Sequence, residues 1–179
     1  MKHLRRTVWY LASRLLVVCL VLGMMVVAFY YAMNATNIYI VLKDGMARRA
    51  QVVMLQEDEK ELTKYFQQSF LERDTALTIT KQGQSPYKDY DIRGIDHRLS
   101  MDFTWVWPWD ESARVDITES IPSIDGRIKG SKAEEAVAQR GANAVYPPAW
   151  QSAKYRAVLA KENGQWRIKS LTLIENLED

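Results

Sequence analysis

The first residues to weigh for chemistry are a histidine and a carboxylate, because such a pair can exchange protons near neutral pH. The chain has two histidines, and His97 lies in a segment where apolar and polar residues alternate. Glu119 lies at the end of the next such segment, and both residues have the parity that faces the interior of a sheet. A five-residue turn between the segments would place Glu119 opposite Met101, about 13 Å along the ladder from His97. We therefore interpret His97 as a structural histidine and predict no catalytic pair.

The other motifs that could carry chemistry do not match their templates. Gly126–Lys132 contains glycines and lysines, but its spacing and the order of Ser131 and Lys132 do not fit a phosphate-binding loop. A Gly-x-Ser-x-Gly nucleophile elbow does not occur. The one cysteine, Cys19, lies in an apolar run, which excludes a disulfide or a cysteine metal site in the C-terminal part. We predict no catalytic residue, no metal site and no cofactor.

Aromatic residues offer candidates for binding a partner. Residues 105–109 read Trp-Val-Trp-Pro-Trp, and Trp105 and Trp107 have the parity that would pack them into a sheet. Trp109 falls in the turn that follows, where an exposed aromatic side chain can anchor a contact with another protein. Trp150, which follows two prolines closely, and Tyr146 are the other candidates for partner contacts.

An apolar segment near the N-terminus predicts a membrane anchor. Leu15–Met33 is uncharged over 19 residues, which as a helix spans about 28 Å, close to the hydrocarbon thickness of a bilayer. Basic residues precede it and the first acidic residue is Asp44, so the positive-inside rule places the N-terminus in the cytoplasm. We predict a cytoplasmic tail (1–14), a span through the inner or plasma membrane (15–33) and an extracytoplasmic remainder. A cleaved signal peptide is the alternative, although the apolar run is long for one and is followed by a poor cleavage site.

The charge of the remainder argues against a nucleic-acid partner. Of the 24 Lys and Arg residues, four lie in the first fourteen positions, which leaves 20 basic residues against 22 acidic ones. A nucleic-acid-binding domain needs a basic face.

Residues 34–56 continue as a helix with one apolar stripe, formed by Tyr39, Leu42, Met46, Ala50 and Val53. We expect this stripe to pack on the chain's own domain, with pairing to a second copy as the alternative.

The periodicity of residues 57–179 predicts an α+β domain. Asp58 begins a helix that ends near Asp74. A long half-buried strand runs from Ile95 to Trp107 with a bulge at Gly94, and it forms a hairpin with 113–118. Residues 122–148 are irregular apart from a short helix at 133–140 capped by Ser131, and Asn163-Gly164 closes a last hairpin between 151–161 and 165–176. We expect one transmembrane helix followed by helices packed on a bent antiparallel sheet.

The last strand carries a family resemblance. Asn163–Glu175 reads NGQWRIKSLTLIE, and this segment, with Trp166 followed by Ile168, resembles the closing strand of nuclear-transport-factor-2-like domains, which have a cystatin-like cone shape. The resemblance covers about Glu57–Asp179. It implies a cone whose cavity would be lined by inward-facing side chains, for which the candidates are His97, Glu119, Met101 and Tyr155.

With its single anchor, the whole chain resembles the inner-membrane assembly components of type IV secretion and conjugation systems, and similar layouts occur in sporulation channels. The resemblance implies a scaffold without catalysis that associates with itself or with other envelope proteins. Two alternatives remain open: a domain that binds a small apolar or envelope ligand in its cone, and an enzyme that uses His97 with a carboxylate.

Overall fold

The computed structural model describes residues 2–55 and 57–177, so the ends of the predicted segments at 1, 56 and 178–179 lie outside the described residues. Its elements follow one another in the order α1 (Lys2–Leu55), η1 (Glu59–Lys64), α2 (Gln68–Leu71), α3 (Thr75–Lys81), β1 (Tyr90–Ile95), β2 (Arg98–Met101), β3 (Ser112–Ser120), β4 (Ile124–Ile128), α4 (Gly130–Arg140), η2 (Ala142–Val145), β5 (Ala153–Glu162) and β6 (Gln165–Asn176). This is the predicted α+β class, with a long apolar N-terminal helix and antiparallel sheets.

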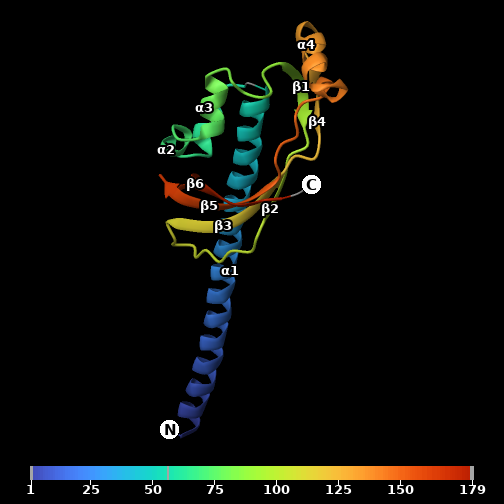
Figure 1. Cartoon of the computed structure of the whole chain (residues 1–179). Helices are drawn as coiled ribbons and strands as arrows, with labels where there is room; N and C mark the ends of the chain where they lie inside the picture. The colour runs from blue at the N-terminus through green and yellow to red at the C-terminus, as the bar shows by residue number, and fades with distance from the viewer. Residues whose placement is uncertain (1, 56, 178–179) are drawn as a thin grey trace.

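One continuous helix joins the anchor to the domain. Helix α1 is 54 residues long, and its first half extends away from the rest of the molecule (Figure 1). It is long and apolar enough to cross a membrane, and its most apolar window is not buried by other parts of the chain. From Asn34 onward one face of the same helix becomes the core of the domain, where Ile38, Leu42 and Met46 are fully buried.

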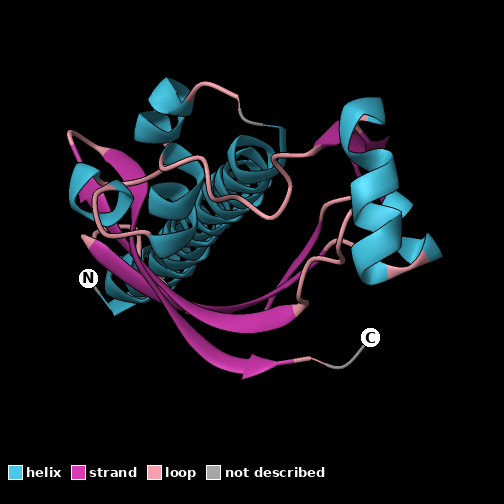
Figure 2. Ribbon diagram, turned by 45° about the horizontal axis from the view of Figure 1, so that its top comes forward, coloured by secondary structure: helices cyan, strands magenta, loops and turns pink. Residues whose placement is uncertain are grey.

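Helix α1 packs against one face of a four-stranded antiparallel sheet with the strand order β2-β3-β5-β6 (Figure 2). The apolar stripe of α1 meets side chains from β3, β5, β6 and the segment after η1, and their fully buried members are Ile117, Leu159, Ile168 and Phe66. The stripe therefore packs on its own domain, as expected. A second, two-stranded sheet pairs β1 with β4 and carries α4 at the end of the molecule opposite the anchor (Figure 1).

The β5–β6 hairpin confirms the clearest local prediction. Asn163 and Gly164 both have positive φ, at 53° and 79°, which is the conformation that a two-residue type I′ turn requires. A two-residue turn at Asn163-Gly164 sets Leu159 opposite Ile168 and Tyr155 opposite Thr172, and the first of these pairs is present. A register shift after this pair then places Tyr155 opposite Leu173 rather than Thr172. The bulge adds a residue that alternation alone does not reveal.

The predicted helix from Asp58 to Asp74 is wrong in its length. Asp58 does cap a helical segment, since its side chain accepts a hydrogen bond from the Lys60 backbone N–H. The chain then breaks into η1, α2 and α3. The break occurs because Ile168 in β6 donates to the Tyr65 carbonyl at 2.7 Å and accepts from the Gln67 N–H at 2.9 Å. These bonds hold the backbone around Phe66 in an extended form.

The predicted strand from Ile95 to Trp107 is also wrong at both ends, because Ile95 ends β1 in the other sheet, β2 covers only Arg98–Met101, and residues 102–111 form a loop. Met101 pairs with Ile117, two residues out of the predicted register. The bulge at Gly94 is confirmed. Its strand pairs with β4, which lies in the segment predicted to be irregular, and the helix predicted at 133–140 is part of α4, with Lys129 rather than Ser131 at its N-cap.

If the buried stripe of α1 is the core of the domain, then Met46→Ala should lower the free energy of unfolding by about 2–5 kcal/mol, since it leaves a cavity. Ile40→Ala is the matched control, because Ile40 is an exposed residue of the same helix segment. We expect it to change the stability by less than about 0.5 kcal/mol. Urea denaturation of the full chain in detergent, followed by tryptophan fluorescence, measures both; equal effects would contradict this packing.

Candidate functional site

His97 and Glu119 are brought together, which corrects the predicted separation of about 13 Å. The Nε2 atom of His97 lies 3.0 Å from Oε1 of Glu119, and their side chains are 6% and 0% exposed. Glu119 pairs with Leu99 rather than Met101 in the β2–β3 ladder. The two-residue shift of register moves Glu119 to the position beside His97.

The arrangement of this pair favours a structural role. A histidine bonded to a carboxylate can act as a general base only where a substrate can approach it. Neither side chain lines the groove at Tyr155 or the three cavities lined by Arg93, Tyr146 and Arg114. Met101, the third inward-facing candidate, packs half-buried against the core and lines no such cavity either. The pair ties the loop before β2 to the end of β3 beneath the core.

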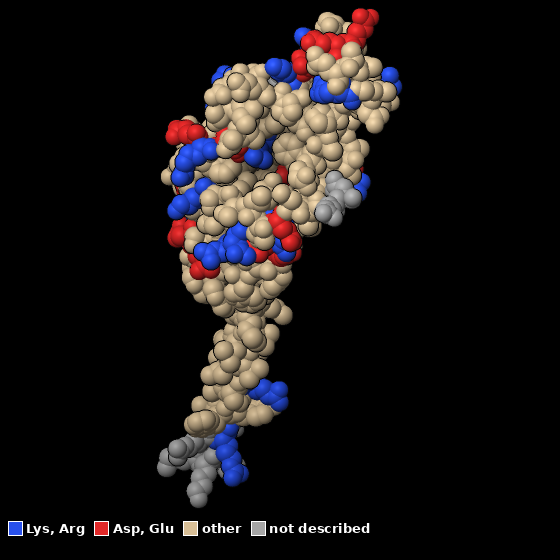
Figure 3. All heavy atoms as spheres, in the orientation of Figure 1, with Lys and Arg blue, Asp and Glu red and all other residues tan. Residues whose placement is uncertain are grey.

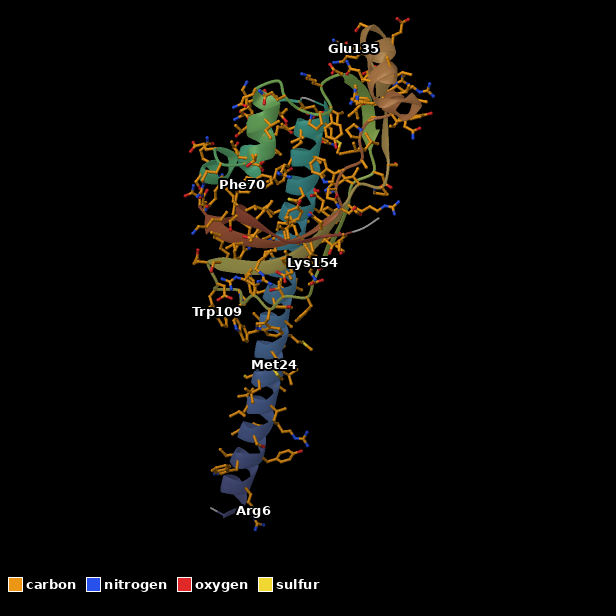
Figure 4. All side chains as sticks on the ribbon, viewed as in Figure 1. Arg6, Met24, Phe70, Trp109, Glu135 and Lys154 are labelled. Carbon is orange, nitrogen blue, oxygen red and sulfur yellow. The ribbon has the colours of Figure 1, made fainter. Side chains whose placement is uncertain are left out.

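A groove opens between the helices α2 and α3 and the strands β5 and β6. It has a volume of about 710 Å³, and Tyr155 is the one predicted cavity residue in its lining. The apolar part of the lining consists of Phe70, Ala76, Ile79, Leu171 and Leu173. This volume is within the range of ligand-binding clefts. Figure 4 shows Phe70 on this side of the domain, above the sheet.

A buried ion pair forms the floor of the groove. Arg49 in α1 donates from Nε and Nη2 to the two carboxylate oxygens of Asp74, at 2.6 Å and 3.2 Å. Asp74 also caps α3 by accepting from the Ala76 and Leu77 N–H groups. Burial alone would lower the pKa of Arg49, but the hydrogen bond and charge of Asp74 outweigh it and raise that pKa. Burial, followed by the charge of Glu119, raises the pKa of Tyr155 above its ordinary value.

The aromatic run lies in the loop after β2. The predicted packing of Trp105 and Trp107 in the sheet is wrong, since these side chains are 56% and 39% exposed. Phe103 and Trp109 are 81% and 66% exposed. Trp109 therefore lies at the surface, at the base of the domain beside α1 (Figure 4).

The other two candidate contact residues differ in exposure. Tyr146 is exposed, with the Arg127 guanidinium 5.8 Å from its ring centroid. Trp150 is half-buried against the core and stacks on Tyr87 at 6.4 Å. Burial raises the pKa of the Tyr87 hydroxyl to about 12. Trp150 thus contributes more to packing than to an open surface.

Sequence reasoning missed the second half of β6. The apolar residues on both faces of the last hairpin predict that each face is partly covered, but Leu173 and Ile174 are 51% and 42% exposed. Successive residues of a strand point to opposite faces, so these two expose apolar surface on both sides. The sequence does carry one indication of this exposed surface: Leu173 and Ile174 are adjacent apolar residues near the end of the last strand.

Comparisons of the chain with protein-family models, with curated proteins and with solved structures found no match. Among the described residues, no group of three or more His, Cys, Asp or Glu side chains is placed to hold a metal ion. The resemblance to nuclear-transport-factor-2-like domains stays a prediction.

Breaking the buried ion pair should be far more costly than breaking an exposed one of similar geometry. We expect Asp74→Ala to lower the free energy of unfolding by about 3–5 kcal/mol, because it leaves the Arg49 charge buried without a partner. Asp116→Ala is the control, since Asp116 and Arg156 form a two-bonded pair at 2.8 Å on an exposed part of the sheet. Its loss should be much smaller. Urea denaturation compares the two, and equal losses would mean that the Arg49–Asp74 pair is effectively solvated.

His97→Ala should lower the free energy of unfolding by about 1–3 kcal/mol, because Glu119 would lose its buried hydrogen-bond partner. Thermal unfolding of the full chain in detergent measures this effect. A variant that kept its full stability would contradict the structural role and would return His97 to the list of functional residues.

Proposed function

We propose that this protein is a single-pass membrane protein whose external domain binds an extended segment of another envelope protein, as part of an assembly and without catalysis of its own. The N-terminal tail is cytoplasmic in this proposal, because basic residues flank α1 on that side. The observation that carries the proposal is the open edge of β6 beside the apolar groove. The resemblance to secretion and conjugation components supports the same class of function.

The edge of β6 is suited to receive another strand. β6 is the last strand of its sheet, and residues 172–176 are exposed. Its first half is covered by the bonds between Ile168 and residues 65–67. An exposed edge offers backbone N–H and C=O groups to an incoming chain, and soluble domains usually block such edges. Strand addition supplies affinity through these groups, and adjacent pockets supply specificity.

The groove indicates the chemistry of the incoming segment. Leu171, Leu173 and Ile79 would receive apolar side chains next to the added strand. Arg73 and Lys169 also line the groove and are exposed, whereas Asp74 is already paired with Arg49. An extended segment with apolar residues at alternate positions and an acidic residue near one end would fit both the walls and the charge.

A second copy of this chain fits the β6 edge poorly. Two identical strands that pair antiparallel are related by a two-fold axis perpendicular to the sheet. Because α1 lies along one face of the sheet (Figure 2), that rotation would reverse α1 and point the second anchor away from the shared membrane. We therefore favour a different polypeptide at this edge over self-association.

Site-specific photo-crosslinking in native membranes tests the proposal. A photoreactive amino acid at Ile174 should give a discrete adduct with another protein, because Ile174 lies in the exposed end of the β6 edge and its side chain is exposed. The same probe at Val137 in α4, which is also exposed, should not. The adduct should disappear when Leu173→Arg is added, since the arginine would block the groove.

Two further measurements decide the interpretation. Leu173→Arg should leave the melting temperature unchanged because Leu173 is exposed, and mass spectrometry should map the adduct to an extended apolar and acidic segment. Adducts with a second copy alone, equal labelling from position 137, or insensitivity to Leu173→Arg would each contradict strand addition at β6.

The groove also favours one alternative function, the binding of a small apolar or envelope ligand. Its volume of about 710 Å³ would hold a single acyl chain or a comparable molecule. Lipid that co-purifies with the full chain and is lost from Leu173→Arg, without any protein adduct at Ile174, would favour this alternative.

A further inference from the structure

We propose that residues 102–111, here called the tryptophan loop, insert their exposed aromatic side chains into the outer interface of the lipid bilayer and seat the domain on the membrane. This inference rests on α1 crossing the membrane, which is part of the proposed function. It concerns a different surface from the groove at β6.

The tryptophan loop is bound to α1 at the residues where the helix leaves its exposed half. The hydroxyl of Tyr31 donates to the Thr104 carbonyl at 3.0 Å, and the amide of Asn34 donates to the Trp107 carbonyl at 3.1 Å. The ring of Tyr31 also stacks on Trp105, with centroids 4.6 Å apart. The loop is therefore fixed to one level of the helix.

The aromatic side chains of the loop form a connected exposed surface. Trp105 meets Trp107 edge to face at 5.1 Å, and Trp107 stacks on Trp109 at 5.1 Å. The backbone of the turn is held from within the domain, because Asp110 accepts from the Trp107 N–H and the Lys161 ammonium donates to the Pro108 carbonyl. The rings are thus presented outward on a loop whose turn is held by hydrogen bonds.

The length of α1 places this surface at the edge of the bilayer. A hydrocarbon core of about 30 Å requires about 20 residues of α-helix. Counted from Arg14, the last basic residue before the apolar run, that length ends at Asn34. The outer boundary of the hydrocarbon core therefore falls at the helix residues to which the loop is bound.

The distribution of charged residues agrees with a bilayer boundary at Asn34. In the face shown in Figure 3, the base of the domain and the adjoining part of α1 have no Lys, Arg, Asp or Glu atoms, and a charged band begins above them. The pairs Asp116–Arg156 and Asp102–Lys154 lie on the sheet and its border with the loop. Lys154 is labelled above Trp109 in Figure 4. Uncharged aromatic surface thus continues from the helix onto the domain.

Tryptophan is the residue best suited to this position. Its ring is apolar and its indole N–H can bond to a headgroup or water, so it gathers at membrane interfaces. A protein partner could also bind exposed tryptophans, but it would have to occupy space that the geometry of α1 gives to lipid. The loop and the helix would together restrict how far the domain can tilt on the membrane.

The test uses the full chain reconstituted into phosphatidylcholine vesicles, with a polarity-sensitive fluorophore on a single cysteine. Three proteins are compared: the natural chain labelled at Cys19, Cys19→Ser with Trp109→Cys, and Cys19→Ser with Val137→Cys. We expect the labels at positions 19 and 109 to be shielded from aqueous iodide, and the label at position 137 to be quenched freely. Lipids with a shallow nitroxide should quench the label at 109 and spare the label at 137.

Intrinsic fluorescence removes the effect of the label. Both proteins compared carry Trp9→Phe. Shallow brominated lipids should strongly quench the tryptophan fluorescence of the chain that keeps its loop tryptophans. The chain that also carries Trp105→Ser, Trp107→Ser and Trp109→Ser should lose most of that quenching. If position 19 is shielded while position 109 is open to iodide, the loop is not in the membrane and this inference fails alone. If position 19 is also open, the anchor itself fails and the proposed function fails with it. Shielding of position 109 only after a second protein is added would identify the loop as a protein-binding surface and would overturn the inference.

Discussion

The structure depends on the change of environment along α1 at Asn34. Between Leu15 and Met33 the helix is uncharged on every side, as a helix in lipid must be. Above Asn34 one stripe is buried against the sheet. Asn34 is itself buried, and it accepts from the Trp166 indole N–H at 2.7 Å while donating to the Trp107 carbonyl. One side chain therefore joins the helix, the last strand and the tryptophan loop.

A consequence of this junction is that the domain has no stalk. In a single-pass protein with a flexible linker, the orientation of the domain would be independent of the membrane. Here the core of the domain is built on the same helix as the span, so a rotation or tilt of α1 is transmitted directly to the sheet. The edge of β6 proposed to bind a partner would be held in a defined orientation to the bilayer for that reason.

The parts of the fold that could be predicted from the sequence are those set by local rules. A charge-free run marks the span, and Asn163-Gly164 determines the turn of the last hairpin. The broken helix after Asp58 could not be predicted, because a distant strand residue, Ile168, provides the competing hydrogen bonds. The contact between His97 and Glu119 could not be predicted for a similar reason. A register shifted by two residues leaves the same side chains on each face of the sheet, so the alternation of residues does not reveal the shift.

The aromatic alternation from Phe103 to Trp109 shows most clearly why sequence reasoning stopped short. A strand that packs on a core and a loop that faces lipid both place apolar side chains against a medium without water. Local sequence does not distinguish the two media. Only the hydrogen bonds of Tyr31 and Asn34 to the loop reveal that these residues lie beside the span. The same logic separates the two aromatic candidates: Trp109 is exposed beside α1, where the proposal places the bilayer interface, whereas Trp150 packs against Tyr87 in the domain.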